Sequence, residues 1–251
     1  MVKVLLFDFD GTLFDTGLGV MRCVQYALGK FGIEEHDEKT LRKFVGPPLD
    51  ESFSELYGFS PEKAREAVWL YRERYQPTGI WECEPYSGMA ETLDAARAAG
   101  FQTAVCTSKP TPSAMKILER YEMVEKFDFI CGSEFDGTRS KKFEVVQACL
   151  EHFGVTDTGT VRMIGDRKYD ILGAGKCGVK AIGVRFGYAE PGELEQYGAE
   201  YIADTAQELE NGGAAYSSYA GTYPSSGFTG SWCLDTTLCN LCCNPCFSPC
   251  C

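Results

Sequence analysis

The sequence predicts an α/β protein: a Rossmann-like, doubly wound parallel sheet with an inserted α-helical cap domain. Short apolar runs alternate with amphipathic stretches of helical length as far as about residue 210. One long interval, residues 15–82, carries helical patterns alone. Strands that alternate with helices form parallel sheets covered on both faces, and an insertion without strands adds a separate helical unit.

The predicted strands are short apolar runs, rich in β-branched residues, that stop at turn residues. The first, Val2–Phe7, ends at an Asp-Phe-Asp-Gly-Thr segment. Runs of this kind are typical of strands buried on both faces of a parallel sheet. The later ones are Gln102–Cys106, Phe127–Cys131, Val161–Ile164, Ala181–Val184 and Tyr201–Ala203.

Helices are predicted where apolar residues recur at spacings of three and four. Those between the strands are Ser87–Ala99, Pro112–Tyr121, Lys141–Phe153 and Asp170–Cys177. Those in the insertion are Met21–Phe31, Glu38–Phe44, Leu49–Tyr57 and Pro61–Tyr75.

The domain boundaries follow from these patterns. The α/β core takes residues 1–14 and 83–211, and the helical cap takes residues 15–82. Ligands of such sheets bind outside the carboxyl ends of the strands, and the insertion leaves the core at the carboxyl end of the first strand. We therefore expect the cap to form a lid over the ligand.

The last segment, residues 212–251, differs in composition from the rest of the chain. It is dominated by Gly, Ser, Tyr and Cys, and it holds seven of the thirteen cysteines. Cys239-x-x-Cys242 and Cys243-x-x-Cys246 have the spacing of zinc ligands, but the pairs abut without an intervening loop. We expect an irregular, adventitious extension outside the fold, with metal or disulfide binding as the alternatives.

Charge and hydropathy limit the partners and the location. The formal net charge of −12 at pH 7 disfavours nucleic acid and anionic membranes, since both select basic surfaces. The N-terminus lacks the pattern of a secretory signal, and no apolar run approaches the roughly 18 residues that span a bilayer. We expect a cytoplasmic protein without a nucleic acid or membrane partner.

Two aspartates, Asp8 and Asp10, follow the first predicted strand on either side of Phe9. Residues two apart on a strand point to the same side, so two carboxylates meet at its carboxyl end. Such a pair repels unless one group is protonated or a cation lies beside it, and Mg²⁺ prefers oxygen ligands. Gly11 would let a phosphate approach the backbone closely. A polar turn with a capping aspartate is the alternative interpretation.

Further polar residues follow the later predicted strands, whose carboxyl ends meet at one edge of a parallel sheet. Together with the first segment they resemble the four motifs of the haloacid dehalogenase-like superfamily of phosphohydrolases. The resemblance covers about residues 1–210. The matching segments are Asp8–Thr16, Val105–Pro110, Lys142–Val146 and Gly165–Asp170.

The resemblance implies a role for each acidic residue. Asp8 would attack phosphorus and form an aspartyl-phosphate. Asp10 would protonate the departing alkoxide and then deprotonate the water that cleaves the intermediate. Mg²⁺ would be held by the Asp8 side chain, the Asp10 backbone carbonyl and Asp166, with Asp170 beside them or just behind.

The resemblance also implies groups that bind the phosphoryl oxygens. Thr107, the amide of Ser108 and Lys142 would grip these oxygens, where electrostatic stabilisation contributes most to phosphoryl transfer. Gly11 and Thr12 would form the turn that receives the substrate.

More than one lysine could bind the phosphoryl oxygens. Lys142 fits the register of the lysine motif, whereas Lys109 and Lys141 are adjacent competitors. Without the other motifs, each of these lysines would be an ordinary solvated charge.

The insertion resembles the caps of the phosphoglycolate-phosphatase-like and β-phosphoglucomutase-like branch, with Gly46–Leu49 in the expected place. The segment Cys131–Ser140 resembles a bacterial group of 5′-nucleotidase-like or phosphoglycolate-phosphatase-like proteins. Caps of this kind close over the substrate and select the leaving group. Arg22, Lys43 and Arg74 could meet a substrate anion there, although solvated surface charge is the alternative that we favour.

The implied activity is Mg²⁺-dependent hydrolysis of a small phosphomonoester, phosphoglycolate-like or nucleoside monophosphate-like. The implied partner is thus a small phosphorylated metabolite, and the enzyme would be a monomer or a small homo-oligomer. A phosphomutase of the β-phosphoglucomutase type is the nearest alternative, because it passes the phosphoryl group from the same aspartate to a second hydroxyl. A non-catalytic metal- or phosphate-binding protein is a further alternative, and dehalogenation is disfavoured because it needs no Mg²⁺.

Overall fold

The computed structural model describes residues 2–209, so the expectations for residues 212–251 lie outside the described part of the chain. Its main sheet consists of the parallel strands β1 (Val4–Phe7), β4 (Gln102–Pro110), β5 (Phe129–Ser133), β6 (Val161–Gly165), β7 (Lys180–Val184) and β8 (Tyr201–Ala203). The strands lie in the order β5-β4-β1-β6-β7-β8. The chain therefore crosses to both sides of β1, which makes the carboxyl end of β1 the switch point where ligands bind in such sheets.

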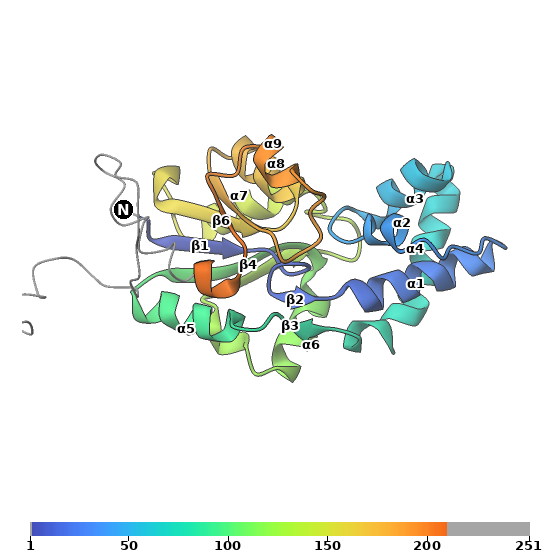
Figure 1. Ribbon diagram of the computed structural model, residues 1–251, viewed down its shortest axis with the longest axis horizontal. Helices are drawn as coiled ribbons and strands as arrows, with labels where there is room; N and C mark the ends of the chain where they lie inside the picture. The colour runs from blue at the N-terminus through green and yellow to red at the C-terminus, as the bar shows by residue number, and fades with distance from the viewer. Residues whose placement is uncertain (1, 210–251) are drawn as a thin grey trace, which may run out of the picture.

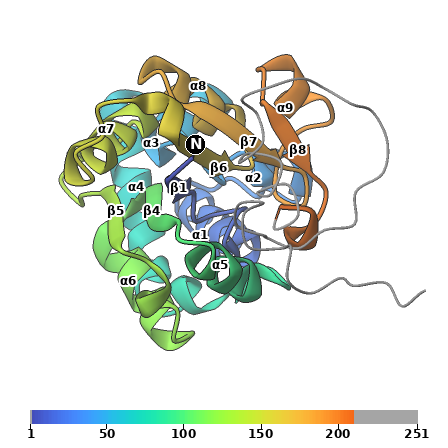
Figure 2. The same cartoon turned by 90° about the vertical axis from the view of Figure 1, so that its left-hand side faces the viewer.

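Helices cover both faces of the sheet (Figure 1 and Figure 2). One face carries α5 (Met89–Ala98) and α6 (Thr111–Arg120). The other face carries α7 (Lys142–His152), α8 (Lys168–Lys176) and α9 (Glu193–Gln196). Single 3₁₀ turns span Gly79–Trp81, Val124–Lys126 and Thr158–Thr160.

The residues of β1 alternate between the two cores on either side of the sheet. Leu5 and Phe7 pack in the cluster that includes the buried residues of α5 and α6. Val4 and Leu6 pack in the cluster that includes the buried residues of α7 and α8. Because successive strand residues point to opposite faces, the next residue, Asp8, points toward α7 and α8.

The helical insertion lies beyond the carboxyl ends of the strands (Figure 1). It consists of α1 (Gly17–Lys30), α2 (Glu38–Arg42), α3 (Leu49–Tyr57) and α4 (Pro61–Tyr75). Its interior is aromatic: the ring of Phe53 lies 4.9 Å from that of Phe44 and 6.0 Å from that of Phe59, measured between centroids. Aromatic pairs at these separations stabilise the cap beyond the area that they bury. These rings belong to the same buried cluster as the residues of α5 and α6, so the cap interior is continuous with one core of the sheet.

The two chain connections between core and cap form a short antiparallel ribbon. It pairs β2 (Phe14–Asp15) with β3 (Glu84–Pro85). We call this ribbon, with the adjoining Gly17 and Tyr86, the hinge. Because both connections lie side by side, a movement of the cap relative to the core must involve this ribbon.

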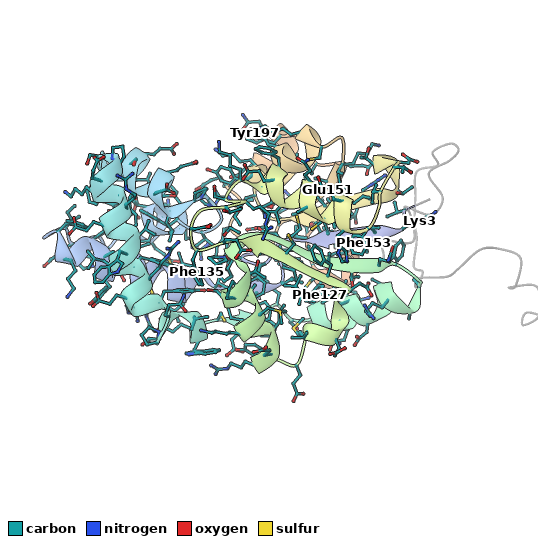
Figure 3. All side chains as sticks on the ribbon, turned by 180° about the vertical axis from the view of Figure 1, so that it is seen from behind. Lys3, Phe127, Phe135, Glu151, Phe153 and Tyr197 are labelled. Atoms are coloured by element: carbon teal, nitrogen blue, oxygen red, sulfur yellow. The ribbon has the colours of Figure 1, made fainter. Side chains whose placement is uncertain are left out.

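Direct contacts also hold the cap against the core. Arg72 in α4 donates a hydrogen bond of 3.2 Å to the carbonyl of Phe135, whose ring lies beside the cap in Figure 3. On another side, the guanidinium of Arg167 donates 2.8 Å to the carbonyl of Val45. Arg167 is itself held by the buried carboxylate of Glu193 at 3.1 Å. The cap therefore rests on the core through several polar contacts.

The predicted fold class is confirmed, and the differences from the prediction are local. The strand predicted at Phe127–Cys131 begins two residues later, because Phe127 closes a 3₁₀ turn and Asp128 caps the neighbouring strand through the Thr103 amide at 2.8 Å. Helix α8 begins before Asp170. The hinge strands were not predicted, since two residues give no periodic pattern. None of the helices in residues 2–209 is long and apolar enough to cross a membrane.

Candidate active site

The predicted catalytic residues come together at the carboxyl end of β1. Asp8 directly follows β1, Asp166 directly follows β6, and Thr107 lies within β4. Lys142 is the first residue of α7, and Asp170 lies in the first turn of α8. The neighbours of β1 on both sides thus supply the site, as the position of the switch point requires.

Three buried carboxylates form the centre of the site. Asp8, Asp166 and Asp170 each offer one oxygen, and these oxygens lie within 4.8 Å of one another. The residues are 3%, 0% and 1% exposed, so water does little to screen their repulsion. Burial raises the pKa of Asp8 to about 7, although Lys142 opposes the shift. Burial, with the carboxylates of Asp170 and Asp8, also raises the pKa of Asp166 well above its ordinary value.

These carboxylates fit a divalent cation. The Oδ1 atom of Asp166 is buried and has no hydrogen-bond partner, which is costly for a carboxylate without a ligand. Its other oxygen, Oδ2, accepts the backbone N–H of Tyr188 at 2.7 Å. Carboxylate oxygens are the donors that hard cations such as Mg²⁺ prefer. Asp8, Asp166 and Asp170 are therefore the residues that would hold the predicted ion by their side chains.

Lys142 connects two of these carboxylates. Its ammonium lies 2.6 Å from Oδ1 of Asp8 and 2.8 Å from Oδ1 of Asp170, and it also donates 3.2 Å to the carbonyl of Cys106. Burial opposes the charge, but the carboxylates of Asp170 and Asp8 outweigh burial and raise the lysine pKa. Its stem passes so close to Gly173 that a β-carbon there would lie 2.7 Å from it.

The competing lysine of the same motif lies elsewhere. Lys141 is exposed and precedes α7 as its N-cap residue, where its backbone N–H donates 3.1 Å to the side chain of Glu144. The structure therefore places Lys142, and not Lys141, among the aspartates.

The turn after β1 packs directly against the carboxylate of Asp166. Gly11 has a φ of +82°, and a β-carbon at this position would lie 2.1 Å from Oδ2 of Asp166. Only glycine fits there, for both conformational and steric reasons. The hydroxyl of Thr12 is buried without a hydrogen-bond partner, and Thr107 is 1% exposed. Ser108, which follows Thr107, is half-buried.

Asp10 lies apart from the three-carboxylate centre. Its Oδ1 atom forms an ion pair of 2.7 Å with Lys109, so its side chain is not one of the clustered metal donors. A metal contact through its backbone carbonyl, as the resemblance implies, remains a prediction. The pairing leaves the Asp10 carboxylate positioned by a cation at the edge of the site.

Lys109, which the sequence offers as an alternative to Lys142, lies beside Asp10 and is a functional candidate in its own right. Its ammonium is 5.5 Å from the ring centroid of Phe9 and 5.2 Å from that of Tyr75 in the cap. Burial disfavours its charge, but Asp10 outweighs burial and raises its pKa. The predicted strand ends at Cys106, and the pairing of β4 with β5 is irregular between Cys106 and Pro110, so strand alternation alone does not place Lys109.

A cavity of about 310 Å³ opens between the cap and the core at the start of α7, and none of the site aspartates lines it. Gly46, Pro48 and Glu51 line it from the cap, while Ser108 and Lys142 line it from the core. Ser108 and Lys142 are two of the residues predicted to bind the phosphoryl oxygens, so the cavity borders the site on this side.

The cap cations are mostly engaged elsewhere. Arg22 and Arg74 both form ion pairs with Glu82, at 2.7 Å and 2.8 Å. Each guanidinium is therefore already paired with a carboxylate of the protein. Lys43 is exposed. The structure therefore gives no support to the alternative in which these residues bind a substrate anion.

Comparison with known proteins gives the family. The family model described as haloacid dehalogenase-like hydrolase matches residues 5–184. A 5′-nucleotidase of Pseudomonas aeruginosa is 42% identical over 203 residues, which cover 80% of this chain and 91% of that protein. A phosphoglycolate phosphatase of Colwellia psychrerythraea is 27% identical and covers 82% of this chain and 95% of its own length.

A solved structure extends this likeness to three dimensions. The crystal structure of a predicted phosphatase from Clostridium acetobutylicum superposes with a TM-score of 0.83 at 39% identity, covering 86% of this chain and 99% of that one. The resemblance stated from the sequence motifs is thus confirmed. The chain belongs to the haloacid dehalogenase-like hydrolase family, and it is an enzyme of the phosphatase type, a phosphoric monoester hydrolase.

Proposed function

We propose that the protein is a Mg²⁺-dependent phosphatase that hydrolyses a small phosphomonoester through an aspartyl-phosphate at Asp8. The observation that carries the proposal is the buried group of Asp8, Asp166 and Asp170, with one orphaned carboxylate oxygen and with Lys142 bonded into it. Such an arrangement is unfavourable in itself, and it becomes favourable when a cation and a phosphoryl group enter.

The residues around Asp8 can position a phosphoryl group for attack. Mg²⁺, when bound, would neutralise charge on the nucleophile and on the phosphoryl oxygens. Lys142, the hydroxyl of Thr107 and the amide of Ser108 would donate to the non-bridging oxygens, in a site that is buried and poorly screened. An Asp8 oxygen would then form the bond to phosphorus as the alkoxide departs.

Asp10 would serve as the general acid and base. It is two residues from the nucleophile and 13% exposed at its side chain, so it can exchange protons with the leaving group and with water. Lys109 would hold it in place, since the ion pair of 2.7 Å and the rings of Phe9 and Tyr75 fix the lysine on two sides.

The names of the relatives and the size of the cavity support a choice of substrate class. A nucleoside monophosphate is our first choice, because the 42% identical relative is named a 5′-nucleotidase, and phosphoglycolate is the second. A cavity of about 310 Å³ suits a small metabolite and not a macromolecule. The test is a screen of nucleoside monophosphates, phosphoglycolate and sugar phosphates, each with Mg²⁺ and with EDTA.

That screen also separates hydrolysis from phosphoryl transfer to sugars. Release of inorganic phosphate that depends on Mg²⁺ is the expected result. Conversion of a sugar phosphate to its isomer, without release of phosphate, would show a mutase instead. Phosphate release that is equal in EDTA would overturn the proposed dependence on the ion.

Replacement of the proposed acid–base residue should slow turnover without removing substrate binding. Asp10→Asn keeps the size of the side chain but cannot donate a proton as an acid does. We expect kcat to fall roughly 10²- to 10⁴-fold, the range typical of general acid–base catalysis. The measurement is steady-state kinetics on the best substrate and on a substrate with an acidic alcohol such as p-nitrophenyl phosphate. The loss should be smaller for the latter, because its leaving group needs no proton, and an equal loss for both would argue against this role.

Magnesium should stabilise the fold, and more so at higher pH. The pKa of Asp8 is raised from 3.8 to about 7, so the metal-free folded protein binds a proton more tightly than the unfolded chain does. Its free energy of unfolding should therefore fall as the pH rises from about 4 to about 7. Mg²⁺ competes with protons for the carboxylates. We expect the ion to raise the melting temperature by on the order of 5 °C near pH 8 and by less near pH 6, measured by calorimetry.

A further inference from the structure

We infer that Tyr188 is a positioning residue that ties the hinge of the cap to the carboxylate of Asp166. Tyr188 makes this connection through two groups: its hydroxyl binds the hinge, and its backbone N–H binds the carboxylate of Asp166. The inference takes one element from the proposed function, namely that the ion bound at Asp166 is Mg²⁺. Its consequence is that ion binding and closure of the cap are coupled.

The hydroxyl end holds the first connection to the cap. It accepts the backbone N–H of Gly17 at 2.6 Å and donates to the carboxylate of Asp15. Asp15 belongs to β2, and Gly17 is the first residue of α1. The tyrosine therefore fixes the point at which the chain leaves the core, through one neutral and one charge-assisted hydrogen bond.

The same loop also touches the second connection. Tyr86 directly follows β3, and its ring packs beside this loop. The ring of Phe186 packs against that of Tyr86 with 4.9 Å between centroids. The backbone N–H of Tyr86 in turn donates 3.0 Å to the carbonyl of Leu13. Both chains of the hinge are thus anchored to the loop that follows β7.

The amide end reaches the proposed metal site. It donates 2.7 Å to Oδ2 of Asp166, which orients the carboxylate with its unpartnered Oδ1 toward the other aspartates. The preceding residue, Gly187, fits tightly, because a β-carbon there would lie 2.3 Å from the carbonyl of Gly11 and 2.4 Å from Asp166. The loop therefore cannot shift without moving the carboxylate.

Glycine at two further positions allows this close approach. A β-carbon at Gly17 would lie 2.8 Å from the hydroxyl oxygen of Tyr188, and one at Gly11 would lie 2.7 Å from its ring. The tyrosine thus packs directly on the backbone of the hinge and on the turn after the nucleophile. A well-packed contact of this kind transmits displacement instead of absorbing it.

Coupling through such a residue works in both directions. An ion that orders Asp166 also orders the amide of Tyr188 and, through its hydroxyl, the hinge. By thermodynamic linkage, whatever fixes the hinge in the closed position must then raise the affinity for the ion by the same factor. Substrate bound under the closed cap would gain affinity for the same reason.

The test is Tyr188→Phe, which removes the hydroxyl and keeps the ring and the amide. Hydrogen exchange of residues 12–17 and 83–87 is measured by mass spectrometry, with Mg²⁺ and with EDTA. In the parent, Mg²⁺ should slow exchange in both segments. In the variant, exchange in EDTA should be about tenfold faster, the effect of one charge-assisted hydrogen bond, and the response to Mg²⁺ should largely disappear.

Matched measurements separate positioning from other roles. Mg²⁺ affinity by titration calorimetry should weaken about fivefold in the variant, and KM for p-nitrophenyl phosphate should rise several-fold with kcat within about twofold of the parent. Tyr57→Phe is the control, because its hydroxyl donates 2.8 Å to Glu35 wholly within the cap, and it should change none of these quantities. Asp15→Asn keeps an acceptor for the Tyr188 hydroxyl but removes its charge, so its effect on exchange should lie between the parent and Tyr188→Phe.

The outcomes distinguish this inference from the proposed function. Parental exchange at the hinge in the Tyr188→Phe variant would overturn the tie, whatever the activity. A large fall in kcat with unchanged KM would also overturn it, since Tyr188 would then act on the reacting atoms. Failure of the parent to bind Mg²⁺ or to hydrolyse phosphomonoesters would overturn the proposed function, while faster exchange of the metal-free variant would still support the tie to the hinge.

Discussion

Asp8→Asn is expected to lower phosphatase turnover roughly 10⁴-fold or more, the scale seen when a covalent nucleophile is removed. The amide cannot form the acyl-phosphate, so what remains is catalysis by the residues that bind and orient the phosphoryl group. The fold should survive, because burial already disfavours the charged form of Asp8 and Asn is neutral. In EDTA the variant should melt at the parental temperature or higher.

The comparison needs a substitution of the same kind far from the site. Asp94→Asn serves, because Asp94 lies on α5 and pairs on the surface with Lys126 at 2.6 Å. It should keep parental turnover, since exposed ion pairs contribute little to stability. Turnover of the Asp8→Asn variant within tenfold of the parent would mean that the nucleophile lies elsewhere.

Lys142→Met should have the second largest effect, and it should act on both activity and stability. Loss of the ammonium removes a donor to the phosphoryl oxygens, and we expect kcat to fall roughly 10²- to 10³-fold. It also leaves Asp8 and Asp170 buried without their shared cation, at distances of 2.6 and 2.8 Å from its former position. Breaking a buried pair on one side costs about 3 kcal/mol, which corresponds to a fall of roughly 6–12 °C in melting temperature.

The stability effect of Lys142→Met should depend on the ion. Mg²⁺ supplies the missing positive charge, so the difference in melting temperature between parent and variant should shrink when the ion is added. Lys141→Met is the matched control, because Lys141 is the exposed neighbour outside the carboxylate group, and it should leave kcat and melting temperature unchanged. If Lys141→Met lowered kcat as much as Lys142→Met does, the assignment of phosphoryl binding to Lys142 would be wrong.

The fold and the centre of the site were predictable because both follow from local patterns. Each buried strand is an unbroken apolar run, and parallel pairing brings the residues that follow such runs to a single edge. Asp8, Asp166 and Lys142 could thus be placed near one another before any distance was known. The alternation of side chains along β1 also predicts the face of the sheet on which Asp8 lies. Leu6 faces α7 and α8, and Asp8, two residues later, points to the same face.

The remaining features depend on partners that no local pattern reveals. Lys109 reads as an ordinary charge until the ion pair with Asp10 is seen, since the two residues are 99 positions apart. Tyr188 carries no motif, and its function depends on Asp15 and Gly17 across 173 and 171 positions. Polar contacts of this kind exist only in the folded chain, because their partners are distant in sequence. Apolar periodicity, in contrast, can be seen within each segment of the sequence.

The most direct test of the central claim is to trap the phosphoryl group on the protein. Enzyme mixed with substrate and Mg²⁺ is quenched in acid during turnover and reduced with borohydride, which converts an aspartyl-phosphate into homoserine. Peptide mass spectrometry then locates the modified position. We predict homoserine at residue 8, dependent on substrate and Mg²⁺ and absent from Asp8→Asn. Modification at another residue, or efficient turnover with no modified residue under conditions that trap a known acyl-phosphate enzyme, would contradict the mechanism.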